Sequence, residues 1–305
     1  MPPSEHPDRP PPSSKSPRPA RDILLLAAAT VLTLTVCYLV ATDIWQVGVE
    51  GEWTWNVFER PAGPIEGSTG IVLAALLVIA LALCLRTGLA TPRAEWLSAL
   101  LVLLLAFAFI TQLDDAGPFG PAQPVLVTAP GWQGGYYGEA VRVEEMGPYL
   151  DDYADMIEKL RVDDIHRGHI ANHPPGPVVF HWLVNRLLNA NPLLAKEWLG
   201  VREPQLQLLQ GQTQRLVGAH VSRPEFAGIW AGGFLLRFLY WLTLPAIYLI
   251  ARRLYDARTA LIAAALAALI PSLNIFAPYV DQALPCFAAW AFLLWHVSVR
   301  RKSWA

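Results

Sequence analysis

Long apolar runs constrain this chain more than any other feature, because about 20 consecutive apolar residues in a helix span the hydrocarbon core of a bilayer. Six runs of about this size occur, at residues 23–41, 70–85, 96–111, 226–251, 259–276 and 283–299. The first three carry no charge, whereas the others contain arginine or proline or end against bases. The runs predict an all-α polytopic membrane protein with about six transmembrane helices.

Composition supports this class and excludes others. Of the 305 residues, 54% are hydrophobic and 16% are charged, against about 45–50% and about 25% in ordinary soluble domains. A net charge of −2 offers no basic field for nucleic acid, so we expect no nucleic-acid partner. The 3 cysteines lie inside apolar runs without metal-ligand or redox spacing, which argues against a disulfide scaffold or a zinc site.

The distribution of bases predicts the orientation of the chain. Residues 1–22 are rich in proline and serine, so we expect a disordered tail, followed by a retained signal-anchor rather than a cleaved signal peptide. Bases concentrate in this tail, near residues 86–95 and 252–258, and at the end 300–305. The positive-inside rule then places both termini in the cytoplasm, with the protein in the cytoplasmic membrane.

This orientation divides the chain into two membrane groups of three helices, residues 23–111 and 226–299. The first group contains an outer loop at 42–69, and a long outer segment, 112–225, joins the groups. Apolar spacing in the outer segment predicts an amphipathic helix over 146–161 that begins near Pro148. Residues 178–189 predict an interfacial amphipathic helix rather than a seventh span. A seventh span would place the basic clusters near residues 252–258 and 300–305 on the outer side of the membrane.

Three histidines follow the first of these helices: His166, His169 and His173. On one helical face they could bind a divalent cation together with Asp163 or Asp164, although Pro174 disfavours a helix at His173. Alternatively, they are polar residues at a membrane interface, or they receive a phosphate with backbone N–H groups at a helix start. The sequence leaves these three interpretations open, and no cofactor is firmly implied.

Carboxylates and tryptophans occur together in the first outer loop. Asp43, Glu50 and Glu52 lie near Trp45 and Trp53. A carboxylate can accept a proton from a sugar hydroxyl, and an indole ring packs on sugar faces, so these acids are candidate catalytic bases. An aromatic belt on a solvated loop is the alternative interpretation.

Two polar residues lie near the apolar runs of the second group. Arg237 falls within the run 226–251, where an unpaired charge costs about 2.5–3.5 kcal/mol on insertion scales. Asp281 precedes the last run, on the side of the long outer segment. Together, the two residues predict a polar cavity in which Arg237 receives a phosphate. Alternatively, Asp281 is only a polar residue at the membrane interface that ends the apolar segment.

Several short motifs, in order along the chain, resemble a known family. The segments are GYYGEA, YLDDY, HPPG, ARRLYDARTA and PSLNIFAPYVDQ. Together with the order of spans, they resemble bacterial membrane glycosyltransferases of the GT-C type, the class of protein O-mannosyltransferases and aminoarabinose transferases. The resemblance implies a polyprenyl-phosphate-linked sugar as donor, an active site at the outer face and a base among Asp43, Glu50 and Glu52. Tyr136 and Tyr137 of GYYGEA join the substrate-binding candidates.

The leading hypothesis is therefore a glycosyltransferase that moves a sugar from a polyprenyl-phosphate carrier to an acceptor. Arg237 and the histidines are expected to hold the departing phosphate, and Asp281 joins them as a substrate-binding candidate. A non-catalytic subunit docked to a larger membrane protein is the alternative, because such enzymes generally have more than six spans. A transporter is a third hypothesis, and the lack of an internal repeat between the two groups disfavours it.

Overall fold

The computed structural model describes residues 19–41, 48–49, 53–54, 64–87, 89, 91–115, 125, 128–129, 135–163, 170, 174–200, 211, 222–270 and 279–301. Nearly all of these residues are helical. The exceptions include two short antiparallel strands, β1 (Gly48–Val49) and β2 (Trp53–Thr54), in which Gly48 pairs with Thr54 and Val49 with Trp53.

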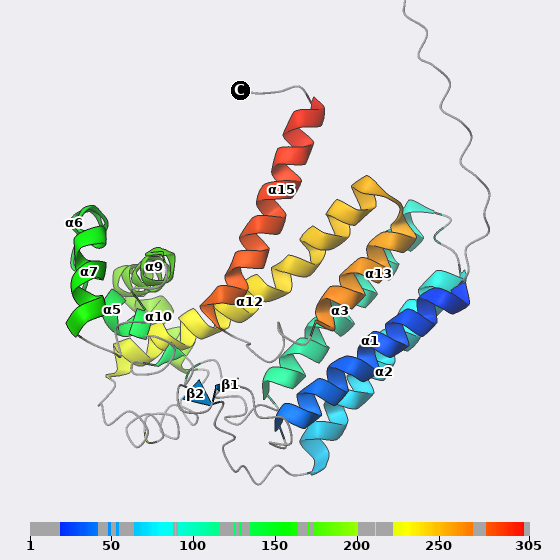
Figure 1. Ribbon diagram of the computed structural model, residues 1–305, viewed down its shortest axis with the longest axis horizontal. Coiled ribbons are helices and arrows are strands. Elements are labelled where there is room, and N and C mark those ends of the chain that lie inside the picture. Colours follow the sequence, from blue (N-terminus) through cyan, green and yellow to red (C-terminus); the bar gives the residue numbers. More distant parts are fainter. Residues whose placement is uncertain are drawn as a thin grey trace, which may run out of the picture.

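Six helices follow the apolar runs: α1 (Pro19–Ala41), α2 (Pro64–Thr87), α3 (Pro92–Asp115), α12 (Arg223–Leu254), α13 (Ala257–Ala268) and α15 (Ala283–Arg301). The chain reverses its direction from each of them to the next, so that both described ends of the chain lie on the same side (Figure 1). The prediction of a helical fold is confirmed.

Three of these helices are long and apolar enough to cross a membrane, over Thr69–Thr87, Pro92–Leu113 and Arg223–Leu254. The apolar parts of α1, α13 and α15 are shorter. α13 ends at Ala268, eight residues before the end of the predicted fifth span, and residues 271–278 lie outside the described part. A membrane-type helical protein is thus supported, and the number of six spans stays a prediction.

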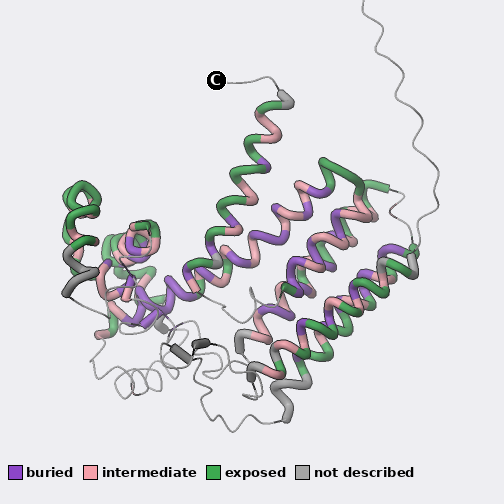
Figure 2. The backbone as a smooth tube through the Cα atoms, viewed as in Figure 1, coloured by how far each residue is buried: buried purple, intermediate pink, exposed green. Residues whose placement is uncertain are grey.

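The core of the bundle lies where α13 meets α3 and α12. Ala260, Ala264 and Ala268 repeat every four residues on α13, and all three are fully or almost fully buried. Small residues at this spacing let helix backbones approach closely. Phe109 of α3 and Tyr240 of α12 fill the same cluster. Figure 2 shows many buried residues along α12 and α13, whereas few residues of α15 are buried.

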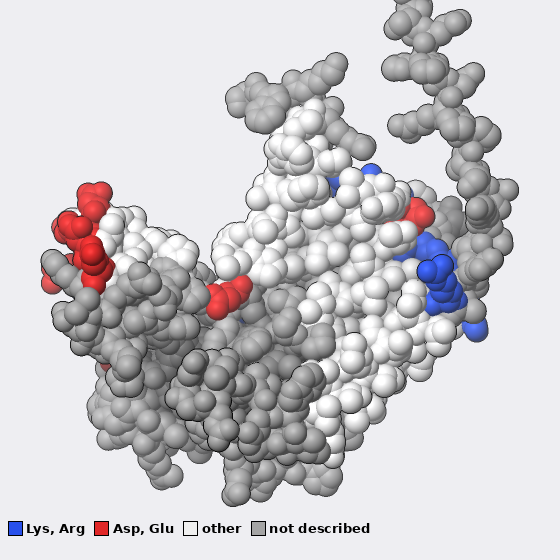
Figure 3. All heavy atoms as spheres, viewed as in Figure 1, with Lys and Arg blue, Asp and Glu red and all other residues white. Residues whose placement is uncertain are grey.

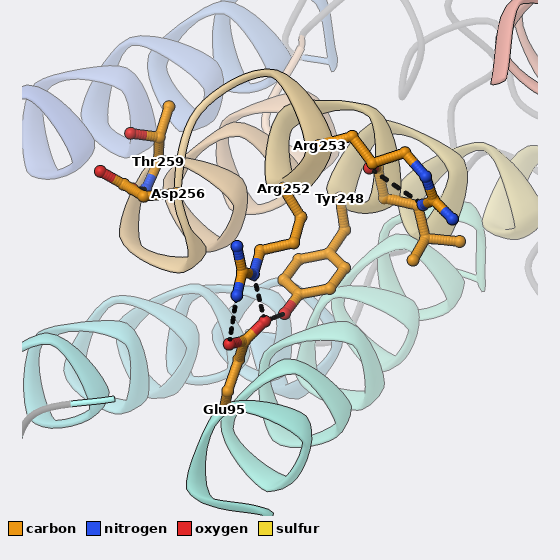
Figure 4. Close-up of polar contacts among 7 residues, drawn as sticks. Glu95, Tyr248, Arg252, Arg253, Asp256 and Thr259 are labelled. Atoms are coloured by element: carbon orange, nitrogen blue, oxygen red, sulfur yellow. Dashed lines mark hydrogen bonds and ion pairs between the residues drawn. The ribbon is translucent and has the colours of Figure 1, made fainter. Parts of the chain in front are cut away.

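A polar cluster, here called the Glu95 clasp, joins the start of α3 to the end of α12 (Figure 4). The Glu95 carboxylate accepts hydrogen bonds from Arg252 Nε and Nη2, at 2.5 and 3.0 Å, in a bidentate ion pair. Tyr248 Oη donates a third bond to Glu95 Oε1 at 3.0 Å. The turn between α2 and α3 therefore lies at the same end of the bundle as the turn between α12 and α13.

Five shorter helices gather at the opposite end and are called the accessory helices: α5 (Tyr136–Arg142), α6 (Met146–Asp151), α7 (Tyr153–Asp163), α9 (Gly176–Ala190) and α10 (Pro192–Gly200). The predicted interfacial helix corresponds to α9. The predicted helix over 146–161 is instead divided into α6 and α7 at Asp152, whose backbone (φ −89°, ψ 2°) leaves the α region. Aspartate tolerates such turns because its carboxylate competes for backbone hydrogen bonds.

Charged side chains are unevenly distributed along the long direction of the molecule, with acids in excess at one end and bases in excess at the other (Figure 3). On the face shown, acids cluster on α6 and α7, and bases predominate at the clasp end, where acidic atoms are also visible. The exposed acids are Asp151, Asp152, Asp155 and Glu158, and the exposed bases of the two turns are Arg86, Arg93, Arg252 and Arg253.

Candidate functional site

A pocket of about 220 Å³ lies where α5, α9 and the first turn of α12 meet. Its polar and aromatic lining consists of Tyr137, Trp182, Asn185, Arg186, Asn189 and Glu225. The pocket thus combines an indole ring, two amides, one guanidinium and one carboxylate. Such a set can pack against a flat polar ligand and hydrogen-bond to it from several directions.

Helix α9 supplies four of these side chains. Residues 182, 185, 186 and 189 follow the spacing that places side chains on one stripe of a helix. Trp182 Nε1 donates a hydrogen bond to the Val143 carbonyl at 3.0 Å, which ties α9 to the end of α5. The Arg186 guanidinium lies 5.1 Å from the centre of the Trp182 ring and also donates to the Glu144 carbonyl. These contacts hold both side chains at the pocket wall.

The first turn of α12 supplies the carboxylate. Ser222 and Glu225 form a capping box, in which Ser222 N and Oγ donate to Glu225 Oε2 at 2.8 and 2.7 Å. Tyr137 Oη donates to the backbone carbonyl of Glu225 at 2.9 Å. The capping box therefore fixes the helix start and the orientation of the carboxylate together.

Two glycines of α12 allow α9 and α5 to pack this closely. A Cβ atom on Gly228 would lie 2.1 Å from Asn185 Oδ1 and 2.8 Å from Tyr137 Oη. A Cβ atom on Gly232 would lie 2.9 Å from His181 Nδ1. The glycines are four residues apart, as are His181 and Asn185, so one stripe of α9 fits against one stripe of α12. Any larger residue at 228 would displace a wall of the pocket.

Burial controls the protonation of the aromatic side chains beside the pocket. His181 is 3% exposed, and this burial lowers its pKa to about 3, so the ring is neutral at pH 7. Its Nδ1 atom has no hydrogen-bond partner among the described residues. Burial raises the pKa of Tyr137, and the nearby Glu225 carboxylate raises it further. The Tyr137 hydroxyl consequently remains a hydrogen-bond donor at neutral pH.

The structure brings together some of the sequence-predicted site residues. Tyr137 lines the pocket, whereas Tyr136 packs into a different cluster with Leu236, Val280 and Ala283. Burial raises the pKa of Tyr136, and the neighbouring Asp281 contributes to this rise. Asp281 lies in the short helix η3 (Val280–Gln282) and is exposed. Arg237 follows Leu236 on α12 and is half-buried. Tyr136 and Asp281 therefore lie near each other, and neither they nor Arg237 line the pocket.

The remaining predicted residues lie outside the described part of the chain: Asp43, Glu50, Glu52, His166, His169 and His173. The catalytic-base and histidine hypotheses therefore stay predictions. Asp164 also lies outside the described part. Among the described residues, no group of three or more histidine, cysteine or acidic side chains could hold a metal ion.

Sequence reasoning missed Trp182, Asn185, Arg186 and Glu225 as site residues. Two signals were present in the sequence. The polar residues of the predicted helix 178–189 repeat on a stripe of their own, and the segment from Ser222 to Glu225 has the S-x-x-E spacing of a capping box. Neither signal reveals that the two segments meet, because Asn185 approaches Gly228, which lies about 40 residues further along the chain.

No family model matches the chain, and no curated protein or solved structure matches it.

Proposed function

We propose that this protein is a membrane glycosyltransferase that moves a sugar from a polyprenyl-phosphate carrier to an acceptor at the outer face of a bacterial cytoplasmic membrane. The observation that carries the proposal is the lining of the pocket between α5, α9 and α12. An indole ring packs on a sugar face, amides bond to hydroxyls, and a guanidinium binds phosphate.

Arg186 suits the phosphate of such a donor. A guanidinium has five N–H donors in a fixed fork. One of its nitrogens donates to the Glu144 carbonyl, which anchors the side chain while other donors remain for a ligand. The ring of Trp182 lies against the same guanidinium and offers its surface to a sugar joined to that phosphate.

The surroundings suit a ligand with a long hydrocarbon tail. The pocket adjoins the first turn of α12, which is one of the three helices long and apolar enough to cross a membrane. Exposed acids outnumber exposed bases on the accessory helices, and exposed bases outnumber exposed acids at the clasp end. By the positive-inside rule, this separation supports an outer position for the pocket and a cytoplasmic position for both termini.

The proposed reaction is an inverting displacement. An acceptor hydroxyl oxygen bonds to the anomeric carbon of the sugar while the bond from that carbon to the phosphate oxygen breaks. The hydroxyl proton passes to a carboxylate, for which Asp43, Glu50 and Glu52 are the candidates. The carrier departs as polyprenyl phosphate, and Arg186 is proposed to offset its negative charge. Arg237, which does not line the pocket, and the histidines at 166, 169 and 173 are the sequence-based candidates for the same role.

The lipids that co-purify with the full chain test donor binding. We expect mass spectrometry to detect a polyprenyl phosphate or its glycosylated form with the unmodified protein, and to lose it with Arg186→Gln. Lys196→Gln is the matched control, because Lys196 is an exposed base on α10 that does not line the pocket. Equal polyprenyl-phosphate content in the two variants, or only bulk phospholipids in every sample, would exclude this pocket as the donor site.

Glycan analysis tests the chemical step separately. Asp43→Asn, Glu50→Gln and Glu52→Gln are made one at a time in cells that depend on the protein for a glycan. We expect one of the three to abolish the product while donor lipid still co-purifies. Full product from all three variants would contradict the proposed base and favour a non-catalytic subunit that docks to a larger membrane protein.

A further inference from the structure

Helices α9 and α10 expose a set of leucines that none of the other described residues covers. Leu183 and Leu187 of α9 are each 55% exposed, and Leu193 and Leu194 of α10 are 77% and 44% exposed. The two leucines of α9 are four residues apart and therefore lie on one stripe of the helix. This leucine face is an apolar surface on helices that are not themselves long enough to span a membrane.

The other sides of α9 are already occupied. Val178, His181, Val184 and Leu188 are buried. The pocket stripe, which includes Trp182 and Arg186, lies next to this buried stripe. The leucine face is the third side of α9. One side of the helix packs against the rest of the protein, the second lines the pocket, and the third has no protein partner among the described residues.

The leucine face continues into the apolar surface of α12. Phe180 of α9, Ala195 of α10 and Leu235 of α12 all pack against one buried cluster, which joins α9 to α12. Next to Leu235 on α12, Phe234 and Phe238 are each 41% exposed. α12 is long and apolar enough to cross a membrane, so its exposed phenylalanines belong to the surface that lipid would cover. The leucines thus adjoin a lipid-facing surface rather than an isolated patch.

The direction of α9 fits the plane of a membrane surface. In Figure 1, α9 is seen nearly end-on, whereas α12 and α13 extend across the view. α9 therefore runs across the direction of the bundle helices, at the end of the bundle away from the Glu95 clasp. An amphipathic helix that lies in a membrane interface has this direction relative to spanning helices.

We propose that α9 and α10 form an interfacial platform whose leucine face is buried in the lipid of one membrane surface. Trp182 and Arg186 then flank the lipid-buried side, where indole rings and long cationic side chains favour the headgroup region. The platform places the mouth of the pocket at the depth of lipid headgroups. Amphiphilic ligands would reach it from the bilayer. The proposal does not depend on the glycosyltransferase reaction.

Spin labels at single cysteines test the platform. In a full-length background with Cys37, Cys84 and Cys286 replaced by alanine, labels are placed by Leu183→Cys, Leu187→Cys or Leu193→Cys, and the protein is reconstituted into phospholipid vesicles. Collision rates with oxygen, which concentrates in lipid, and with a water-soluble nickel chelate are compared. Leu76→Cys on α2 gives the lipid reference, and Glu158→Cys on α7 gives the water reference, because both side chains are exposed.

We expect the ratio of oxygen to chelate collisions at 183, 187 and 193 to approach that at 76 and to exceed that at 158 several-fold. Chelate access equal to that at 158 would overturn the platform by placing the leucines in water. Low access to both reagents, with an immobilised spectrum, would also overturn it, because another protein or a second copy would then cover the leucines.

Discussion

At the scale of single residues, His181 makes the stability of the protein depend on pH. Its pKa is about 3 in the folded protein and about 6.5 ordinarily, because burial disfavours the imidazolium. Between these values, the unfolded chain binds a proton that the folded protein does not bind. The stabilisation is therefore fully present above about pH 6.5 and is lost as the pH falls toward 3.

For His181 we expect a loss of about 2 kcal/mol in the free energy of unfolding between pH 7 and pH 5. Thermal unfolding of the detergent-purified protein at these two pH values measures the effect as a lower Tm at pH 5. His181→Gln is the control, since it removes this proton while the other histidines remain. The same fall in Tm for both proteins would show that His181 is not the cause.

The same side chain shows why residue-level site prediction was incomplete. Tyr137 was found because it belongs to the GYYGEA segment, whereas nothing near His181 in the sequence indicates that it is enclosed. The enclosure depends on Gly232, which is 51 residues further along the chain and leaves space for the imidazole. A site assembled from two distant helical stripes requires knowledge of their pairing, which hydrophobic periodicity does not contain.

At the scale of elements, the Glu95 clasp connects α3 to α12. Its ion pair is bidentate. The Glu95 side chain is 12% exposed and the Arg252 side chain is 44% exposed. In a double-mutant cycle with Glu95→Gln and Arg252→Gln, we expect a coupling of about 0.5–1 kcal/mol in unfolding free energy, as for partly exposed ion pairs. Chemical unfolding in mixed micelles measures the four proteins of the cycle.

Arg253 provides the control cycle for this clasp. It neighbours Arg252 but donates to the Leu249 carbonyl of its own helix, at 3.4 Å. Arg253→Gln should therefore show no coupling to Glu95→Gln. Equal coupling in the two cycles would indicate a general charge effect rather than a specific contact.

Elements with strong periodicity were predicted best. The predicted helix 178–189 agrees with α9 to within two residues at each end, because its apolar stripe, its preceding prolines and its following proline mark the boundaries. The predicted helix 146–161 missed the break at Asp152, since its apolar spacing continues across the break. Periodicity indicates which side of a segment is apolar, but it does not detect a single residue with a non-helical backbone within the segment.

At the scale of the whole molecule, charge separation predicts the orientation of the chain. In intact cells, with the native cysteines replaced by alanine, a membrane-impermeant maleimide should label Glu158→Cys on α7. It should label Arg253→Cys only after the membrane is disrupted. The two positions are exposed and lie on opposite ends of the molecule, so the reverse pattern would show that the chain is inserted with its accessory helices inside.

The sequence was informative about the whole molecule because apolar length and charge bias are summed over many residues. A single exception, such as Arg237 within α12, has little effect on the total apolar length or on the overall charge bias. The position of the accessory helices was less predictable. It depends on two glycines and a capping box that together occupy only a few positions of α12.

The uninterrupted length of α12 has a further consequence for how the chain tolerates insertions. Gly228 near one end fits the pocket helices, and Arg252 near the other end forms the clasp. A helix turns by about 100° per residue, so one added residue between these positions would rotate one contact surface away from its partner. A turn between helices can gain one residue at little cost in stability. The 32 residues of α12, in contrast, fix the directions in which the side chains at its two ends point relative to each other.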